Sequence, residues 1–132
     1  MGNLRVTGSL PGSYYDEDRQ FKTGEMREAC MNVPGVTYAA AVLIPNEESE
    51  SGLCGFLIEA DSIGDPERIA DAVEASIVSN VEDVSDVEVT FEKDRAVPQS
   101  IQRLYEEMDA ARAAGDRPLA AEIEDALANR QG

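Results

Sequence analysis

Three short runs of acidic residues are the part of this sequence best suited to bind a hard cation. They are Asp16-Glu17-Asp18, Glu47-Glu48-Ser49-Glu50 and Glu82-Asp83. Carboxylate oxygens are the ligands that calcium and magnesium prefer in proteins. None of the runs has the spacing of a calcium-binding loop, so the pattern favours acidic loops in contact with solvent. We predict no metal site and no cofactor.

The chain contains no histidine. Its absence removes the commonest general base, the serine–histidine and cysteine–histidine nucleophile pairs, and most zinc sites. Carboxylates and tyrosines can still transfer protons. The candidates for a site of this kind are Tyr14, Tyr15, Asp16, Arg19 and Glu25. Their spacing singles out no pair, so we predict no catalytic residue and retain unrelated acid–base chemistry as an alternative.

Residues that could bind a ligand or partner lie in the same N-terminal region. Tyrosine is enriched in protein interfaces, so Tyr14 and Tyr15 either face a partner or cover one edge of the core. Arg19 and Lys22 are positive charges in a chain that has 11 basic residues against 27 acidic ones. They either anchor an anionic ligand or the acidic face of a carrier protein, or form ion pairs with neighbouring carboxylates.

Length and charge limit the classes of function. A chain of 132 residues corresponds to one domain with a single core. Its formal net charge of -16 at pH 7 repels phosphate backbones and anionic membranes. We therefore predict neither a nucleic-acid partner nor a membrane partner.

Cysteine usage and hydropathy indicate the compartment. Cys30 and Cys54 lie on expected apolar faces, so we predict two reduced thiols that fill the core rather than a disulfide. No apolar run approaches the length of about 18 residues that spans a bilayer, and the N-terminus has no charged region followed by an apolar stretch. The sequence therefore predicts a soluble, cytoplasmic protein.

Turn signals and apolar spacing divide the first half of the chain. Leu4–Thr7 is a possible short strand, and Tyr14–Lys22 is a loop or one arm of an exposed hairpin. A helix is expected between an N-cap at Thr23 and the turn at Pro34-Gly35. Its apolar stripe would consist of Met26, Cys30 and Met31. Two apolar segments then predict an antiparallel pair of strands, Val36–Ile44 and Gly52–Ala60.

The second half contains three expected helices and one strand. Asp65-Pro66-Glu67 begins a helix whose covering face is Ile69, Val73 and Ile77. Alternating apolar residues from Val84 to Phe91 predict a final strand. Two amphipathic helices follow Pro98 and Gly115-Asp116, and their apolar stripes are Ile101, Leu104, Tyr105 and Met108 in the first and Leu119, Ile123 and Leu127 in the second. They form a helical hairpin.

The order strand, helix, strand, strand, helix, strand is typical of the ferredoxin-like arrangement. We predict an α+β fold with an antiparallel sheet, helices on one face and a C-terminal helical hairpin. Residues 1–97 would form the core and residues 98–132 the hairpin of the same domain. The hairpin either packs on the exposed face of the sheet or reaches to another subunit.

Residues 24–36 read G-E-M-R-E-A-C-M-N-V-P-G-V and precede the apolar run from Tyr38 to Ile44. This segment resembles the start of the C-terminal lid domain of the adenylate-forming superfamily, which includes acyl-CoA synthetases, peptide-synthetase adenylation domains and luciferases. There, G-E-I-E-x-x-L-x-x-x-P-G-V precedes a similar strand. The residues that carry the likeness are Gly24, Glu25, Pro34, Gly35 and Val36. It extends roughly over Arg19–Met108 and is specific over Gly24–Ile44.

The sequence departs from that family at its two catalytic segments. The glycine-bearing loop that lines the family's thioester site is absent, because Arg19-Gln20-Phe21-Lys22 runs directly into Thr23-Gly24-Glu25. The family's L-P-x-T-x-x-G-K motif corresponds to residues 96–103, which have no Gly-Lys between Ser100 and Ile101. Loss of a cation at a developing phosphoryl charge costs about 3 kcal/mol or more. Arg95 or Arg103 could supply the positive charge of the missing lysine.

The resemblance therefore implies a stand-alone, non-catalytic accessory protein that acts with an adenylate-forming ligase or carrier protein in acyl or aminoacyl activation, or as a homodimer. The apolar stripes of the two terminal helices would be its docking surface. One alternative is a ferredoxin-like regulatory domain that responds to a small molecule. Arg103 and Arg112 lie on opposite sides of their expected helix, about 180° apart, and should not form one site.

Overall fold

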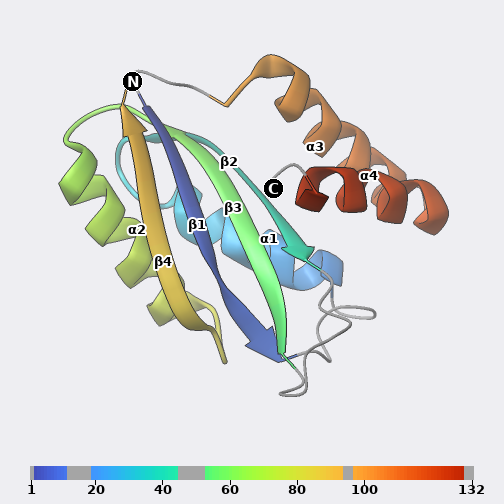
Figure 1. Ribbon diagram of the computed structural model, residues 1–132, viewed down its shortest axis with the longest axis horizontal. Coiled ribbons are helices and arrows are strands. Elements are labelled where there is room, and N and C mark those ends of the chain that lie inside the picture. The colour runs from blue at the N-terminus through green and yellow to red at the C-terminus, as the bar shows by residue number, and fades with distance from the viewer. Residues whose placement is uncertain (1, 12–18, 45–52, 94–96, 130–132) are drawn as a thin grey trace.

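The computed structural model describes residues 2–11, 19–44, 53–93 and 97–129. Figure 1 shows their arrangement. In chain order the elements are β1 (Gly2–Pro11), α1 (Arg19–Met31), β2 (Val36–Ile44), β3 (Leu53–Ser62), α2 (Pro66–Asn80), β4 (Ser85–Lys93), α3 (Gln99–Ala113) and α4 (Arg117–Asn129). Tyr14, Tyr15 and the acidic runs at 16–18 and 47–50 lie outside the described residues.

The four strands form one antiparallel sheet in the order β2-β3-β1-β4. β1 pairs with β3 on one side and β4 on the other, so Leu4 lies between Ala60 and Phe91. This strand order and the βαββαβ succession confirm the predicted α+β ferredoxin-like fold. β1 extends beyond the predicted Leu4–Thr7. β2 and β4 form the two edges of the sheet.

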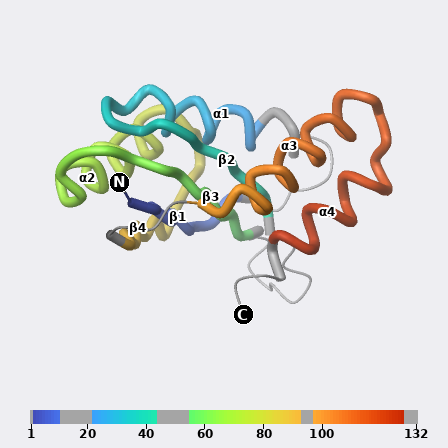
Figure 2. The backbone as a smooth tube through the Cα atoms, turned by 90° about the horizontal axis from the view of Figure 1, so that it is seen from above, coloured from blue at the N-terminus to red at the C-terminus, as the bar shows by residue number. Residues whose placement is uncertain are grey.

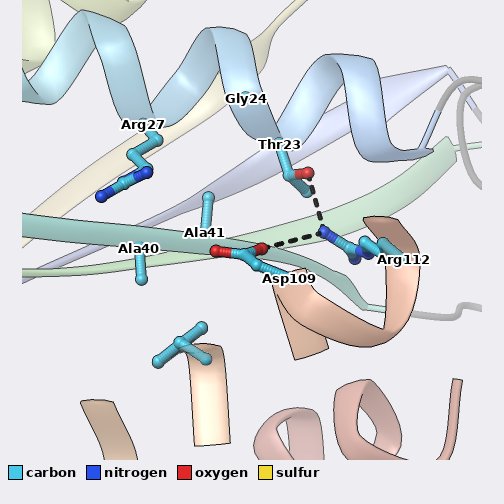
Figure 3. Close-up of a pocket in the computed structure, with 8 residues that line it drawn as sticks. Thr23, Gly24, Arg27, Ala40, Ala41, Asp109 and Arg112 are labelled. Carbon is cyan, nitrogen blue, oxygen red and sulfur yellow. Dashed lines mark hydrogen bonds and ion pairs between the residues drawn. The ribbon is translucent and has the colours of Figure 1, made fainter. Parts of the chain in front are cut away.

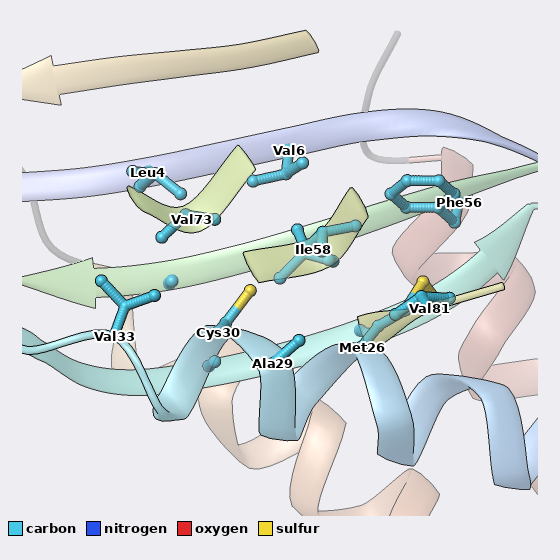
Figure 4. Close-up of a cluster of buried hydrophobic side chains, with 14 of the residues drawn as sticks. Leu4, Val6, Met26, Ala29, Cys30, Val33, Phe56, Ile58, Val73 and Val81 are labelled. Atoms are coloured by element: carbon cyan, nitrogen blue, oxygen red, sulfur yellow. The ribbon is translucent and has the colours of Figure 1, made fainter. Parts of the chain in front are cut away.

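The first face of the sheet packs against α1 and α2. Every second residue of each strand points into this core, including Leu4 and Val6 of β1 and Phe56 and Ile58 of β3. Figure 4 shows these side chains against Met26, Ala29 and Cys30 of α1. The core also confirms the predicted face of α2, because the buried residues of that helix are Ile69, Val73 and Ile77.

Two details of α1 differ from the sequence prediction. The helix begins at Arg19, so Thr23 lies inside it rather than at its N-cap. The Thr23 hydroxyl instead accepts a hydrogen bond from Arg112. Met31 is 41% exposed and does not belong to the buried stripe. One residue corresponds to about 100° around a helix, which turns Met31 away from Cys30 and the core.

The two predicted turns around α1 and α2 are confirmed. Gly35 follows α1 with φ 98°, and a Cβ there would come within 2.7 Å of the Ile63 carbonyl oxygen. Glycine is therefore required both by the conformation and by the close approach of the chain. At the start of α2, the backbone N–H of Glu67 donates to Asp65 Oδ1 at 3.1 Å, and Pro66 occupies the first helical position.

The helical hairpin α3–α4 covers the second face of the sheet over β2 and β3. Ala40 and Val42 of β2 and Leu57 of β3 pack there against Tyr105, Met108, Ile123 and Leu127. Figure 2 shows the hairpin and the α1–α2 layer on opposite sides of the strands. The predicted docking surface on the terminal helices is thus wrong, because most of that apolar stripe is buried against the chain's own sheet. Leu119 is the exception, with 43% exposed.

The apolar stripe of the hairpin covers the sheet of its own chain, because β2 is apolar on both faces. Ala39, Ala41 and Leu43 enter the first core, and Ala40 and Val42 enter the second. A strand with such a continuous apolar run must be covered on both sides. None of the helices in the described ranges is both long and apolar enough to cross a membrane.

Asp61 of β3 anchors the start of the hairpin. Its Oδ1 accepts a short hydrogen bond from the backbone N–H of Val97. Gln102 of α3 donates from Nε2 to the Val97 carbonyl oxygen at 2.9 Å and to Asp61 Oδ2 at 3.4 Å. Burial raises the pKa of Asp61, and the hydrogen bond from Val97 lowers it in part.

We expect Leu127→Ala to lower the free energy of unfolding by about 3 kcal/mol, because it opens a cavity at a fully buried position between hairpin and sheet. Leu119→Ala, the same change on the exposed side of α4, should cost less than about 1 kcal/mol. Urea denaturation of both variants measures the difference. Equal costs would contradict the placement of α4.

We expect Asp61→Asn to remove a pH dependence of stability. The pKa of Asp61 is raised in the folded protein, so the folded state binds more protons than the unfolded state in the window above the ordinary aspartate pKa. Stability from this group is present below the pKa of the unfolded chain and is lost as pH rises through the folded value. We subtract the free energy of unfolding of Asp61→Asn from that of wild type. In denaturant titrations this difference should fall as pH rises above the ordinary aspartate pKa. A difference that rises with pH would refute the assignment.

Candidate functional site

A cavity of about 300 Å³ lies at the β2 edge of the sheet, between α1 and α3. Figure 3 shows its lining. The lining residues come from three elements, and they are Thr23, Gly24, Arg27, Ala40, Ala41, Tyr105, Asp109 and Arg112. The cavity therefore exists only because the hairpin folds back beside α1.

Helical and strand spacing explain why these residues converge. Thr23 and Arg27 are four residues apart and lie on one face of α1. Tyr105, Asp109 and Arg112 occupy positions i, i+4 and i+7 on α3, which also form a single face. Between the helices, Ala40 and Ala41 of β2 carry only methyl groups, which point to opposite faces of the strand, so the space beside its edge stays open.

Arg112 is the buried polar centre of this region. Its Nη1 donates to Thr23 Oγ1 at 3.1 Å, and its Nη2 donates to Glu124 Oε2 at 2.9 Å. The side chain of Arg112 is 7% exposed and that of Glu124 is fully buried. Arg112 thus joins α1, α3 and α4, and its charge is matched by a carboxylate in direct contact. Asp109 Oδ1 lies 4.0 Å from Arg112 Nη1 with a side chain that is 58% exposed.

Arg27 holds the other positive charge of the cavity. Its Nε donates to the Ala39 carbonyl oxygen at 2.9 Å, so the side chain lies along the edge of β2. Within the described part of the chain, its two terminal nitrogens form no hydrogen bond or ion pair. An edge strand presents backbone groups that could pair with another chain. Arg27 covers one of these groups and leaves part of its guanidinium available.

Tyr38 of β2 lies within the electrostatic reach of the cavity's charges. Burial raises the pKa of its hydroxyl to about 12, with Arg27 lowering the pKa and Glu106, Asp109 and Glu59 raising it. The hydroxyl is protonated at neutral pH, as that of an ordinary tyrosine is. Tyr38 is not among the residues that line the cavity.

The structure brings few of the predicted site residues to this cavity. Gly24 lines it, whereas Lys22 is buried and pairs with Glu25 Oε2 at 3.2 Å, which is the ion-pair alternative for that lysine. Arg103 is exposed on α3 and is not among the lining residues. Arg19 belongs to α1, but its side chain, like Tyr14 and Tyr15, lies outside what the structure describes.

The sequence did not predict Arg27, Tyr105 or Asp109 as site residues. Arg112 was not predicted either, because it lies opposite Arg103 on the helix. The spacing of Tyr105, Asp109 and Arg112 was the available signal, since i, i+4, i+7 marks one helical face. It could not show which element that face meets.

The other groups considered from the sequence, the acidic residues and the cysteines, form no second candidate site within the described ranges. No group of three or more histidine, cysteine or acidic residues there is placed to hold a metal ion. Cys30 is a buried free thiol whose pKa is raised to about 12 by burial, so it fills the core as predicted. The side chain of Cys54 is outside the described residues.

A scan against protein-family models finds no match to this chain, and a search of the curated proteins finds none either.

We expect Arg112→Met to lower the free energy of unfolding by about 3 kcal/mol or more, because it removes the arginine that pairs with the buried Glu124 carboxylate at 2.9 Å. The double variant Arg112→Met/Glu124→Leu should recover most of this loss. Arg103→Met, on the exposed side of the same helix, should stay within about 0.5 kcal/mol of wild type. Denaturant unfolding measures all three variants, and an Arg112→Met variant as stable as wild type would contradict the role of the ion pair.

Proposed function

We propose that this chain is a non-catalytic binding domain that assists a partner in acyl or aminoacyl activation, and that the β2-edge cavity receives the charged group it recognises. The observation that carries the proposal is Arg27. It is an exposed arginine held at the mouth of a cavity, and its terminal nitrogens make no bond to any described residue. In a chain of net charge -16, a positive group presented in this way is a recognition element.

The chemistry of the lining supports binding rather than proton transfer. Arg27 and Arg112 present guanidinium groups, whose N–H donors bind carboxylates and other anions. Arg112 is also fully engaged with Thr23 and Glu124, which fixes the wall of the cavity.

The link to acyl or aminoacyl activation is supported by two sequence features. Gly24–Ile44 resembles the start of the adenylate-forming lid domain. From α1 to β4 the succession helix, strand, strand, helix, strand is also related to that of the lid domain. The proposed partner is an adenylate-forming ligase or its carrier protein.

The test is complex formation with an adenylate-forming ligase or carrier protein encoded beside this chain, measured by light scattering at low and high salt. We expect a complex that weakens with salt and that Arg27→Gln weakens about tenfold, because one charge-assisted contact is lost. Arg68→Gln, an exposed arginine on α2, is the matched control and should bind as wild type does. No complex with either partner, or equal weakening by both variants, would refute the proposal.

A second candidate is a small-molecule-responsive ferredoxin-like domain. The observation that favours it is the size of the cavity, which at about 300 Å³ suits a small ligand and is formed within one chain. Thermal shift of the chain alone discriminates the two candidates. A ligand at a hundred times its dissociation constant should add about 2.7 kcal/mol of stability, whereas a domain that recognises only a protein should not respond.

A further inference from the structure

We propose that the β2-edge cavity binds a free α-amino acid with an apolar side chain, its carboxylate paired with Arg27 and its ammonium group with Asp109. This inference rests on the second candidate function, a domain that responds to a small molecule, and names the class of ligand. It does not depend on any protein partner, because every group that it uses belongs to this chain.

The charge balance of the lining points to a ligand that carries both signs. Of the two arginines, Arg112 is neutralised by Glu124 at 2.9 Å and tied to Thr23. The charges left to face a ligand are the guanidinium of Arg27 and the carboxylate of Asp109. Within the described residues no ion pair joins these two side chains to each other, and the Asp109–Arg112 contact is long, at 4.0 Å.

A simple anion fits this arrangement less well. The net charge of -16 opposes the approach of any anion, and Asp109 would face it across the cavity. A zwitterion has no net charge and is not repelled by the field of the whole protein. It also satisfies both exposed charges at once, which a singly charged ligand cannot do.

The remaining lining is mostly apolar and suits an apolar side chain. Ala40 and the buried ring of Tyr105 belong to the hairpin side of β2, whereas Ala41 belongs to the α1 side. Figure 3 shows Ala41 pointing from β2 toward α1 and Ala40 pointing the other way, with Asp109 beside Arg112.

The test is a titration of the full chain on its own. NMR chemical-shift changes and thermal shift report the binding. The probes are L-leucine, N-acetyl-L-leucine, which lacks the ammonium group, and L-leucinamide, which lacks the carboxylate. We expect L-leucine to bind at least about tenfold more tightly than either analogue, because each analogue loses one charge-assisted contact. The shift changes should map to α1, β2 and α3.

Variants assign the two contacts separately. Arg27→Gln should weaken L-leucine about tenfold but leave the weak binding of L-leucinamide unchanged, and Asp109→Asn should show the converse pattern with N-acetyl-L-leucine. Arg68→Gln and Asp71→Asn, an exposed pair on α2, are the charge-matched controls and should bind as wild type does.

Three outcomes would overturn the inference. One is binding of N-acetyl-L-leucine as tight as that of L-leucine, which would identify an anion site. The second is no response to any probe up to about 10 mM. The third is L-leucine binding that both variants leave intact. No partner is present in this titration. A negative result would therefore refute this inference without deciding whether the chain forms a complex with a ligase or carrier protein.

Discussion

The guanidinium of Arg112 lies where three helices meet, with its side chain only 7% exposed, and it contacts a fully buried carboxylate on Glu124. Two such charges are costly to remove from water unless each has the other as its partner. The pair therefore allows only arrangements in which α3 and α4 lie side by side. The additional bond to Thr23 ties that hairpin to α1 across the edge of the sheet. This contact acts together with the apolar packing of the hairpin on β2 and β3 to fix the position of the hairpin, and the cavity depends on that position.

Much of the ferredoxin-like part of the fold could be predicted because its signals are local. Alternating or continuous apolar runs located β2 and β3, Asp65-Pro66 located the start of α2, and the Pro34-Gly35 turn separated α1 from β2. The misplaced start of α1 has a physical cause. Residues 19–22 have no apolar spacing of their own, and Thr23 has the chemistry of an N-cap, although here its hydroxyl serves a bond from a residue 89 positions away.

The site was harder to predict because it depends on contacts that no local pattern encodes. Amphipathic spacing showed that Tyr105 and Met108 must be covered but did not show by what, so a partner and the chain's own sheet were equally compatible with it. The deciding information was in β2, where Ala40 and Val42 form a second apolar face between the residues of the first. Arg27 and Asp109 lie on different helices, far apart in sequence, and line one cavity only in the fold.

The run of alanines in β2 gives the cavity a wall made largely of main chain. Ala39, Ala40 and Ala41 have no side-chain rotamers, and hydrogen bonding to β3 fixes their backbone. The shape of that wall cannot adjust by the side-chain rearrangements through which many pockets accommodate different ligands. Adaptability is left to the long side chain of Arg27, which is held to the strand through a single nitrogen. The cavity thus combines a rigid backbone wall with one mobile charged side chain. The backbone would select the size of a ligand, and Arg27 would select its charge.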